Sequence, residues 1–131
     1  NLAQKTNSLL GIDENRFAIA DARENAKNNR ISNARFMTKP VKSAVEAMVK
    51  KNETFDLVVL DPPRAGVGRI TLEGIITLKP KRIVYVSCSS STLARDSKTL
   101  VAGGFKPNRF QPIDLFPQTH HLETVVEFTL T

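Results

Sequence analysis

The chain has 131 residues, 40% of them hydrophobic and 24% charged, as expected for one soluble globular domain with a sizeable core. Nineteen basic and thirteen acidic residues give a net charge of +6. This charge suits binding of a polyanion such as RNA, or it only maintains solubility. The single cysteine excludes an internal disulfide and a cysteine-based metal cluster. Without a long apolar span or a signal-peptide pattern, we expect a cytoplasmic protein with no membrane partner.

Strand and helix patterns alternate along the chain, which predicts an α/β fold with a mostly parallel sheet. Residues 2–6 resemble the end of a helix. Six apolar runs predict strands at residues 8–12, 33–37, 55–60, 83–86, 105–112 and 124–130. Helical spacing predicts helices at residues 14–29, 41–51 and 72–79, and one that follows Cys88 and stops at Gly103. No helix separates the last two strands, so they can pair antiparallel.

The helix at residues 14–29 has small residues at helical spacing, Ala18, Ala22 and Ala26. We expect this face to pack closely on a sheet, with Phe17 as a larger anchor. The helix at residues 41–51 has one apolar stripe.

Three polar or reactive side chains, those of Asp13, Asp61 and Cys88, follow predicted strands. Ligands of parallel sheets bind beyond the carboxyl ends of the strands, so this convergence predicts a site. Cys88 lies between a strand and a helix start, whose unpaired N–H groups favour a reactive thiolate. A buried, inert cysteine is the alternative. Asp13 can bind a ribose, with Glu14 as a substitute, or it can cap the following helix.

Three motifs, in this order and spacing, resemble the RNA uracil-5-methyltransferase family. They are residues 61–64 (Asp-Pro-Pro-Arg), the junction at Cys88, and residues 116–123 (Phe-Pro-Gln-Thr-His-His-Leu-Glu). The resemblance covers the chain from residue 10 to the C-terminus. It implies methylation of carbon 5 of a uridine in RNA, with S-adenosylmethionine as cofactor. Residues 64–66 (Arg-Ala-Gly) favour 23S ribosomal RNA, and transfer RNA is the second choice.

The resemblance also implies residue roles and a fold. Cys88 matches the family's nucleophile and Glu123 its base, whereas Asp13 matches the ribose contact and Asp61 lies beside the cofactor and the target base. The implied fold is a Rossmann-like class I methyltransferase with an antiparallel last strand. The first strand and its glycine-rich loop are expected upstream, as are the cysteines of the iron–sulfur cluster that some relatives carry. Residues 1–131 are therefore expected to be the C-terminal portion of a catalytic domain, inactive alone.

The chain departs from the family at two places. Ser89 and Ser90 replace the usual Asn-Pro, so a looser turn is expected after the cysteine. Lys39 and Pro40 stand where the family often has a polar contact to adenine.

Other interpretations stay open at this point. The Asp-Pro-Pro sequence also suits a methyltransferase of amino groups on bases, and the basic charge suits a non-catalytic RNA-binding relative. No metal is expected, because His120 and His121 are adjacent on an extended segment and point to opposite faces. Five basic residues are candidate RNA contacts: Arg64, Arg69, Lys81, Arg82 and Arg95.

Overall fold

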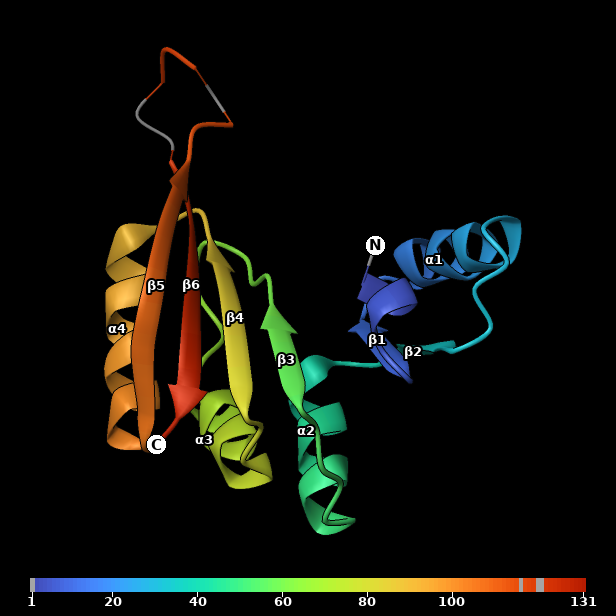
Figure 1. The fold of residues 1–131 in the computed structure, drawn as a ribbon, viewed down its shortest axis with the longest axis horizontal. Coiled ribbons are helices and arrows are strands. Elements are labelled where there is room, and N and C mark those ends of the chain that lie inside the picture. The colour runs from blue at the N-terminus through green and yellow to red at the C-terminus, as the bar shows by residue number, and fades with distance from the viewer. Residues whose placement is uncertain (1, 116, 120–121) are drawn as a thin grey trace. The chain divides into compact units, whose positions relative to one another are not determined.

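The computed structural model describes residues 2–115, 117–119 and 122–131. The chain divides into two compact units, Asn1–Ala47 and Met48–Thr131, and the helix α2 (Val41–Lys50) crosses the boundary between them. Figure 1 shows the elements, and each unit is described by itself.

The first unit is a parallel pair of strands with one long helix. Its elements are the 3₁₀ helix η1 (Leu2–Lys5), β1 (Leu9–Asp13), α1 (Arg16–Asn28) and β2 (Ala34–Thr38). In the register of the pair, Leu9 lies opposite Ala34. The Asn33 side chain donates to the carbonyl oxygens of Ala3 and Thr6, both at 2.7 Å, and so ties η1 to the start of β2.

The predicted anchor role of Phe17 is wrong. Its side chain is 65% exposed, whereas Ile19 is buried. Each residue turns an α-helix by about 100°, so Phe17 lies about 160° around α1 from Ile19. The covered stripe runs instead through the buried Ile19 and the half-buried Ala22 and Ala26, whereas Ala18, which was predicted to share this face, is exposed. The guanidinium of Arg16 covers the exposed ring, 4.6 Å from its centroid.

The second unit is built on a four-stranded sheet. Its elements are β3 (Leu57–Leu60), α3 (Arg69–Leu78), β4 (Arg82–Ser87), α4 (Ser90–Ala102), β5 (Phe105–Ile113) and β6 (Glu123–Leu130). The strand order is β3-β4-β6-β5, in which β3 and β4 are parallel and β6 is antiparallel to both neighbours. The predicted antiparallel last strand is confirmed, and so is the class of fold. The hydrogen bonds, however, form two sheets rather than one, because β1 and β2 pair only with each other.

One face of the four-stranded sheet is covered by α3 and α4, which lie on the same side (Figure 1). The helices approach closely at Gly103, where a Cβ would lie 2.6 Å from Cδ1 of Ile76. The buried side chains of this layer are Leu72, Ile75, Ile83, Tyr85, Leu93, Leu100, Val126 and Phe128. Burial of each large apolar side chain contributes roughly 1.5–3 kcal/mol, so this layer is the main core of the unit. On the other face, side chains are less covered, and Val59 is 46% exposed.

Candidate active site

Cys88 and Glu123 lie at the same end of two neighbouring strands. Cys88 directly follows β4, and Glu123 is the first residue of β6. The last pair of the β4–β6 ladder is Ser87 opposite Thr124. Opposite residues of an antiparallel pair have Cα atoms about 4.5–5.5 Å apart. One position further out, the same register brings Cys88 and Glu123 to the same level, although 35 residues separate them in the chain.

Asp61 directly follows β3, the other neighbour of β4, at the same end of the sheet. Leu60, the last residue of β3, lies opposite Tyr85 of β4, so Asp61 reaches the level of Val86. The Tyr85 side chain is buried under the helices. Side chains alternate between the two faces of a sheet. By this alternation, positions 61, 86 and 88 lie on the face opposite to Tyr85, which is the less covered one. The β4–β6 pairing assigns position 123 to that face as well.

The junction at Cys88 is a strand-to-helix turn, as predicted. The Ser87 hydroxyl donates to the Ser89 carbonyl oxygen at 2.9 Å, and the Ser89 N–H donates back to that hydroxyl at 3.1 Å. Ser89 is the N-cap residue of α4. Cys88, the residue between these two serines, is half-buried with a free thiol, so it is not fully buried, and its reactivity stays a prediction. Two hydrogen bonds close the turn, and the looser turn expected from the missing proline stays a prediction.

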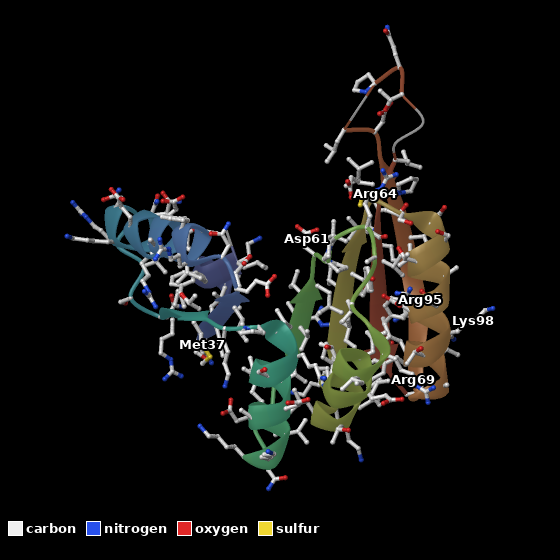
Figure 2. All side chains as sticks on the ribbon, turned by 180° about the vertical axis from the view of Figure 1, so that it is seen from behind. Met37, Asp61, Arg64, Arg69, Arg95 and Lys98 are labelled. Atoms are coloured by element: carbon white, nitrogen blue, oxygen red, sulfur yellow. The ribbon has the colours of Figure 1, made fainter. Side chains whose placement is uncertain are left out.

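Residues 61–68 form the loop that follows β3, here called the 61–68 loop. Asp61 is exposed at its start, and Pro62 and Pro63 restrict the backbone directly after it. A turn follows, in which the Gly66 N–H donates to the Pro63 carbonyl oxygen at 2.8 Å. Figure 2 shows Asp61 and Arg64 at the end of the sheet where β3 and β4 end.

Asp96, a buried carboxylate beneath the 61–68 loop, was not predicted from the sequence. The side chain is only 2% exposed. Its Oδ2 accepts hydrogen bonds from the Tyr85 hydroxyl at 2.7 Å and the Val67 N–H at 2.9 Å. Its Oδ1 accepts from Nε and Nη2 of Arg95. A sequence signal did exist, because Leu93, Asp96 and Leu100 share the core-facing stripe of α4, and a charged residue there requires partners.

We expect Tyr85 to ionise only at strongly alkaline pH. Burial, and then the hydrogen bond to Asp96, raise the pKa of its hydroxyl far above the ordinary value near 10. The stability from this group is therefore fully present below about pH 10 and is lost as pH rises through the folded pKa. The measurement is the ultraviolet absorbance of tyrosinate, taken as the difference between wild type and Tyr85→Phe. A midpoint near pH 10 in the folded protein would contradict the buried network.

Asp13 belongs to the first unit, where it is the exposed last residue of β1. Its Oδ1 accepts a hydrogen bond from the Asn15 N–H at 2.7 Å. The N-cap of α1 is Asn15, whose side chain accepts from the N–H groups of Phe17 and Ala18. The alternative of Asp13 as the cap is therefore wrong, because the helix begins two residues later than that alternative requires.

Four of the five predicted basic contacts pair with carboxylates. The pairs are Arg69 with Glu73 at 2.7 Å, Lys81 with Asp56 at 2.6 Å, Arg82 with Glu127 at 3.7 Å, and Arg95 with Asp96 at 2.8 Å. Lys81 lowers the pKa of Asp56, and Glu73 raises that of Arg69, in each case mainly through the hydrogen bond. The Arg95 head also donates to the Ala65 carbonyl oxygen, so it belongs to the Asp96 cluster. Arg64 is exposed on the 61–68 loop.

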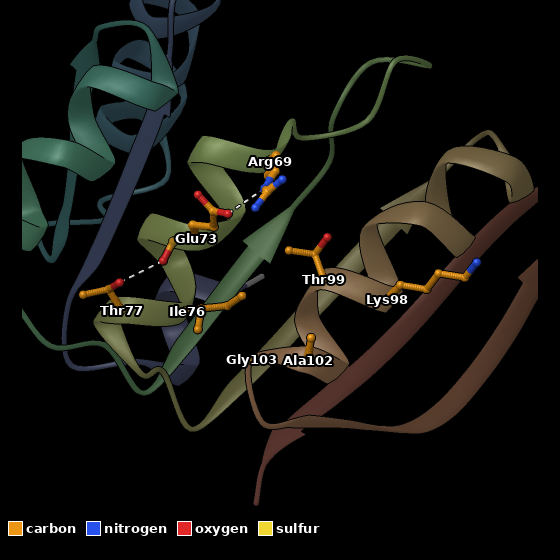
Figure 3. A pocket seen from close by; sticks show the side chains of 8 residues that line it. All are labelled: Arg69, Glu73, Ile76, Thr77, Lys98, Thr99, Ala102 and Gly103. Atoms are coloured by element: carbon orange, nitrogen blue, oxygen red, sulfur yellow. Dashed lines mark hydrogen bonds and ion pairs between the residues drawn. The ribbon is translucent and has the colours of Figure 1, made fainter.

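A groove of about 610 Å³ lies elsewhere in this unit, between α3 and α4 (Figure 3). Its lining residues are Arg69, Glu73, Ile76, Thr77, Lys98, Thr99, Ala102 and Gly103. Asp61, Cys88 and Glu123 are not among them, so the groove is separate from the strand-end site.

The described residues contain no group of three or more His, Cys, Asp or Glu side chains that could hold a metal ion. His120 and His121 lie outside the described residues, so the prediction about them stays a prediction. Within the described ranges, every helix is too short or too polar to cross a membrane.

The fold is that of the class I methyltransferases. A solved tRNA (uracil-54, C5)-methyltransferase from Pyrococcus abyssi, in complex with S-adenosyl-L-homocysteine, superposes with a TM-score of 0.81 at 33% identity. The match covers 98% of this chain and 30% of that one. NSun6 from Pyrococcus horikoshii, at 15% identity and a TM-score of 0.74, shows the fold alone over 98% of this chain and 43% of its own.

The sequence comparisons identify the family within this class. The family model described as tRNA (Uracil-5-)-methyltransferase matches residues 1–130. An uncharacterised RNA methyltransferase of Listeria innocua is 42% identical over 129 residues, which are 98% of this chain and 28% of the relative. The 23S rRNA (uracil(1939)-C(5))-methyltransferase RlmD of Aeromonas hydrophila is 42% identical over 127 residues, 97% of this chain and 29% of the relative. The chain belongs to the tRNA (uracil-5-)-methyltransferase family, and it spans less than a third of these relatives.

Proposed function

We propose that the protein carrying this chain methylates carbon 5 of a uridine in RNA through a covalent adduct with Cys88. The observation that carries this proposal is the register of β4 and β6, which brings a half-exposed thiol and a carboxylate to one strand end. Family membership and the names of the relatives support the same reaction.

In this mechanism the residues of the chain divide the work between two steps. Carbon 5 of uracil is a poor nucleophile. The Cys88 thiolate adds to carbon 6, which makes carbon 5 electron-rich, and carbon 5 then takes the methyl group. Glu123 removes the proton from carbon 5, the carbon 5–carbon 6 double bond re-forms, and the thiolate leaves. Covalent catalysis thus replaces one difficult step by easier ones.

The methyl donor of the proposal is S-adenosylmethionine, which supplies an electrophilic methyl group when bound. Asp13 and Asp61 are the residues of this chain that would hold it. Both are exposed carboxylates at the carboxyl ends of strands, where α/β sheets bind nucleotides. The Asp13 carboxylate uses Oδ1 for the Asn15 N–H, and its second oxygen suits a ribose hydroxyl.

The proposed substrate is 23S ribosomal RNA, with transfer RNA as the alternative. Relatives named RlmD support the ribosomal substrate, whereas the relative from Pyrococcus abyssi is named for transfer RNA. The net charge of +6 suits either polyanion. A cytoplasmic location is part of this proposal.

We also propose that these residues are the C-terminal portion of the catalytic domain. The edge of β3 away from β4 has no partner strand among the described residues, and the apolar side chain of Val59 is 46% exposed. An exposed apolar edge strand can pair with another strand, and natural proteins usually blunt or cover such an edge. We infer that a further strand, supplied by the rest of the protein, covers this edge.

The proposal is tested with the full-length protein, S-adenosylmethionine and unmodified transcripts of 23S ribosomal RNA and transfer RNA. Nucleoside analysis should find 5-methyluridine in the ribosomal transcript at the higher rate. Methylated adenine or cytosine would favour the amino-group alternative. Binding of both RNAs without any methylation would favour a non-catalytic relative.

A further inference from the structure

The 61–68 loop and α4 meet at the buried carboxylate of Asp96. The loop donates the Val67 N–H to Oδ2 at 2.9 Å, and it offers the Ala65 carbonyl oxygen to Nη2 of Arg95 at 2.8 Å. Arg95 in turn bonds Oδ1 of Asp96 at 2.8 Å. Consecutive residues of α4 therefore bind two backbone groups of one loop.

The sheet fixes the other side of this carboxylate. The Tyr85 hydroxyl of β4 donates to Oδ2 at 2.7 Å, and both residues are almost completely buried. A buried carboxylate with four donors is costly to disturb, because a donor is left buried and unpaired wherever an accepting oxygen is removed. The cluster is therefore a rigid junction between β4, α4 and the loop.

Gly66 shows how closely the loop packs on this cluster. Its φ of 81° is a left-handed conformation that favours glycine. A Cβ on Gly66 would lie 2.5 Å from Asp96 Oδ2 and 2.5 Å from Arg95 Nη2. With any larger residue, the loop or the side chains of Arg95 and Asp96 would have to shift.

We propose that Asp96 is a positioning residue, which holds the 61–68 loop against α4 and thereby sets the spacing between Asp61 and Cys88. The cluster joins the 61–68 loop to α4, and the two residues lie at the starts of these two elements. Asp61 begins the loop, and Cys88 immediately precedes the N-cap of α4. The catalytic consequence rests on the proposed function. A displacement of about 1 Å at a reacting centre can cost about 100-fold in rate.

The test compares Asp96→Asn and Gly66→Ala in the full-length protein with wild type. Asparagine offers one oxygen instead of two and directs an N–H₂ group at a donor, so it should release the loop. At saturating RNA that contains 5-fluorouridine, we expect both variants to form the covalent adduct about 10- to 100-fold more slowly. RNA binding, which depends mainly on phosphate contacts, should be unchanged in a filter assay.

Leu100→Val is the matched control, because it opens a cavity under the same helix with no polar atom that could bond the loop. All rates are taken below the thermal midpoint of each variant, measured by circular dichroism. A role in stability alone would lower the midpoint of all three variants and leave the adduct rate at the wild-type value. That result overturns the inference. If Asp96→Asn does not fold, Gly66→Ala and Tyr85→Phe decide by the same comparison.

Amide hydrogen exchange separates this inference from the proposed function. The Val67 N–H should be protected in wild type and exchange at least about tenfold faster in Asp96→Asn, whether or not RNA is captured. Equal exchange in the two proteins overturns the inference. A wild-type protein that protects Val67 but captures no RNA overturns the proposed function and leaves the loop attachment standing.

Discussion

Cys88→Ala should abolish both methylation and covalent capture of 5-fluorouridine RNA by the full-length protein. The alanine side chain has no nucleophile that could add to carbon 6, so carbon 5 is never activated. RNA affinity should change little, because phosphate contacts dominate it. The measurements are transfer of a labelled methyl group and the shifted band on a denaturing gel.

The matched control for this variant is Ser90→Ala. Ser90 is exposed in the first turn of α4, two residues from Cys88, and also loses one small polar group. We expect this control to methylate and to form the adduct at rates close to wild type. Methylation by Cys88→Ala at the wild-type rate would remove the thiol from the mechanism and favour an amino-group methyltransferase.

Glu123→Gln should separate formation of the adduct from its release. The first step needs only the Cys88 thiolate, so the adduct with ordinary uridine RNA should still form. Removal of the carbon 5 proton needs the carboxylate, and a general base typically contributes about 10²–10⁴-fold, so turnover should fall by that order. The methylated RNA–protein complex should then accumulate on denaturing gels.

Glu127→Gln is the control for this second variant. Glu127 lies four residues further along β6, on the same face by strand alternation, and pairs with Arg82 at 3.7 Å rather than with the site. It should release methylated RNA as wild type does. Normal turnover of Glu123→Gln without a trapped complex would leave Glu123 as a half-buried acid at a strand end.

Most of the secondary structure could be predicted because the periodic patterns are strong. The apolar runs of β3 and β4, and the stop at Gly103 after α4, place these elements within two residues of the observed bounds. The strand-end positions of Asp61 and Cys88 follow directly from those patterns. The position of Glu123 opposite Cys88 depends on the β4–β6 register, which the sequence does not encode locally.

The environments of Phe17, Asp96 and Arg95 could not be predicted from the sequence, because they depend on three-dimensional packing. Phe17 is apolar and lies in a helix, yet it points away from the stripe of Ile19, so residue type alone was misleading. Asp96 and Tyr85 are 11 residues apart, and only the fold of β4 against α4 joins them. Arg95 was predicted as a candidate RNA contact. Its hydrogen bonds to Asp96 and to the Ala65 carbonyl oxygen could not be predicted from the sequence.

We propose that Cys88 forms a covalent bond to carbon 6 of the target uridine. The most direct measurement is peptide mapping by mass spectrometry of the complex trapped on RNA that contains 5-fluorouridine. We expect one nucleotide adduct, on the peptide that contains Cys88. Without S-adenosylmethionine the thiolate adds reversibly, so the adduct should be lost when the complex is denatured. An adduct on another residue, or methylated RNA with no trapped complex, would contradict the claim.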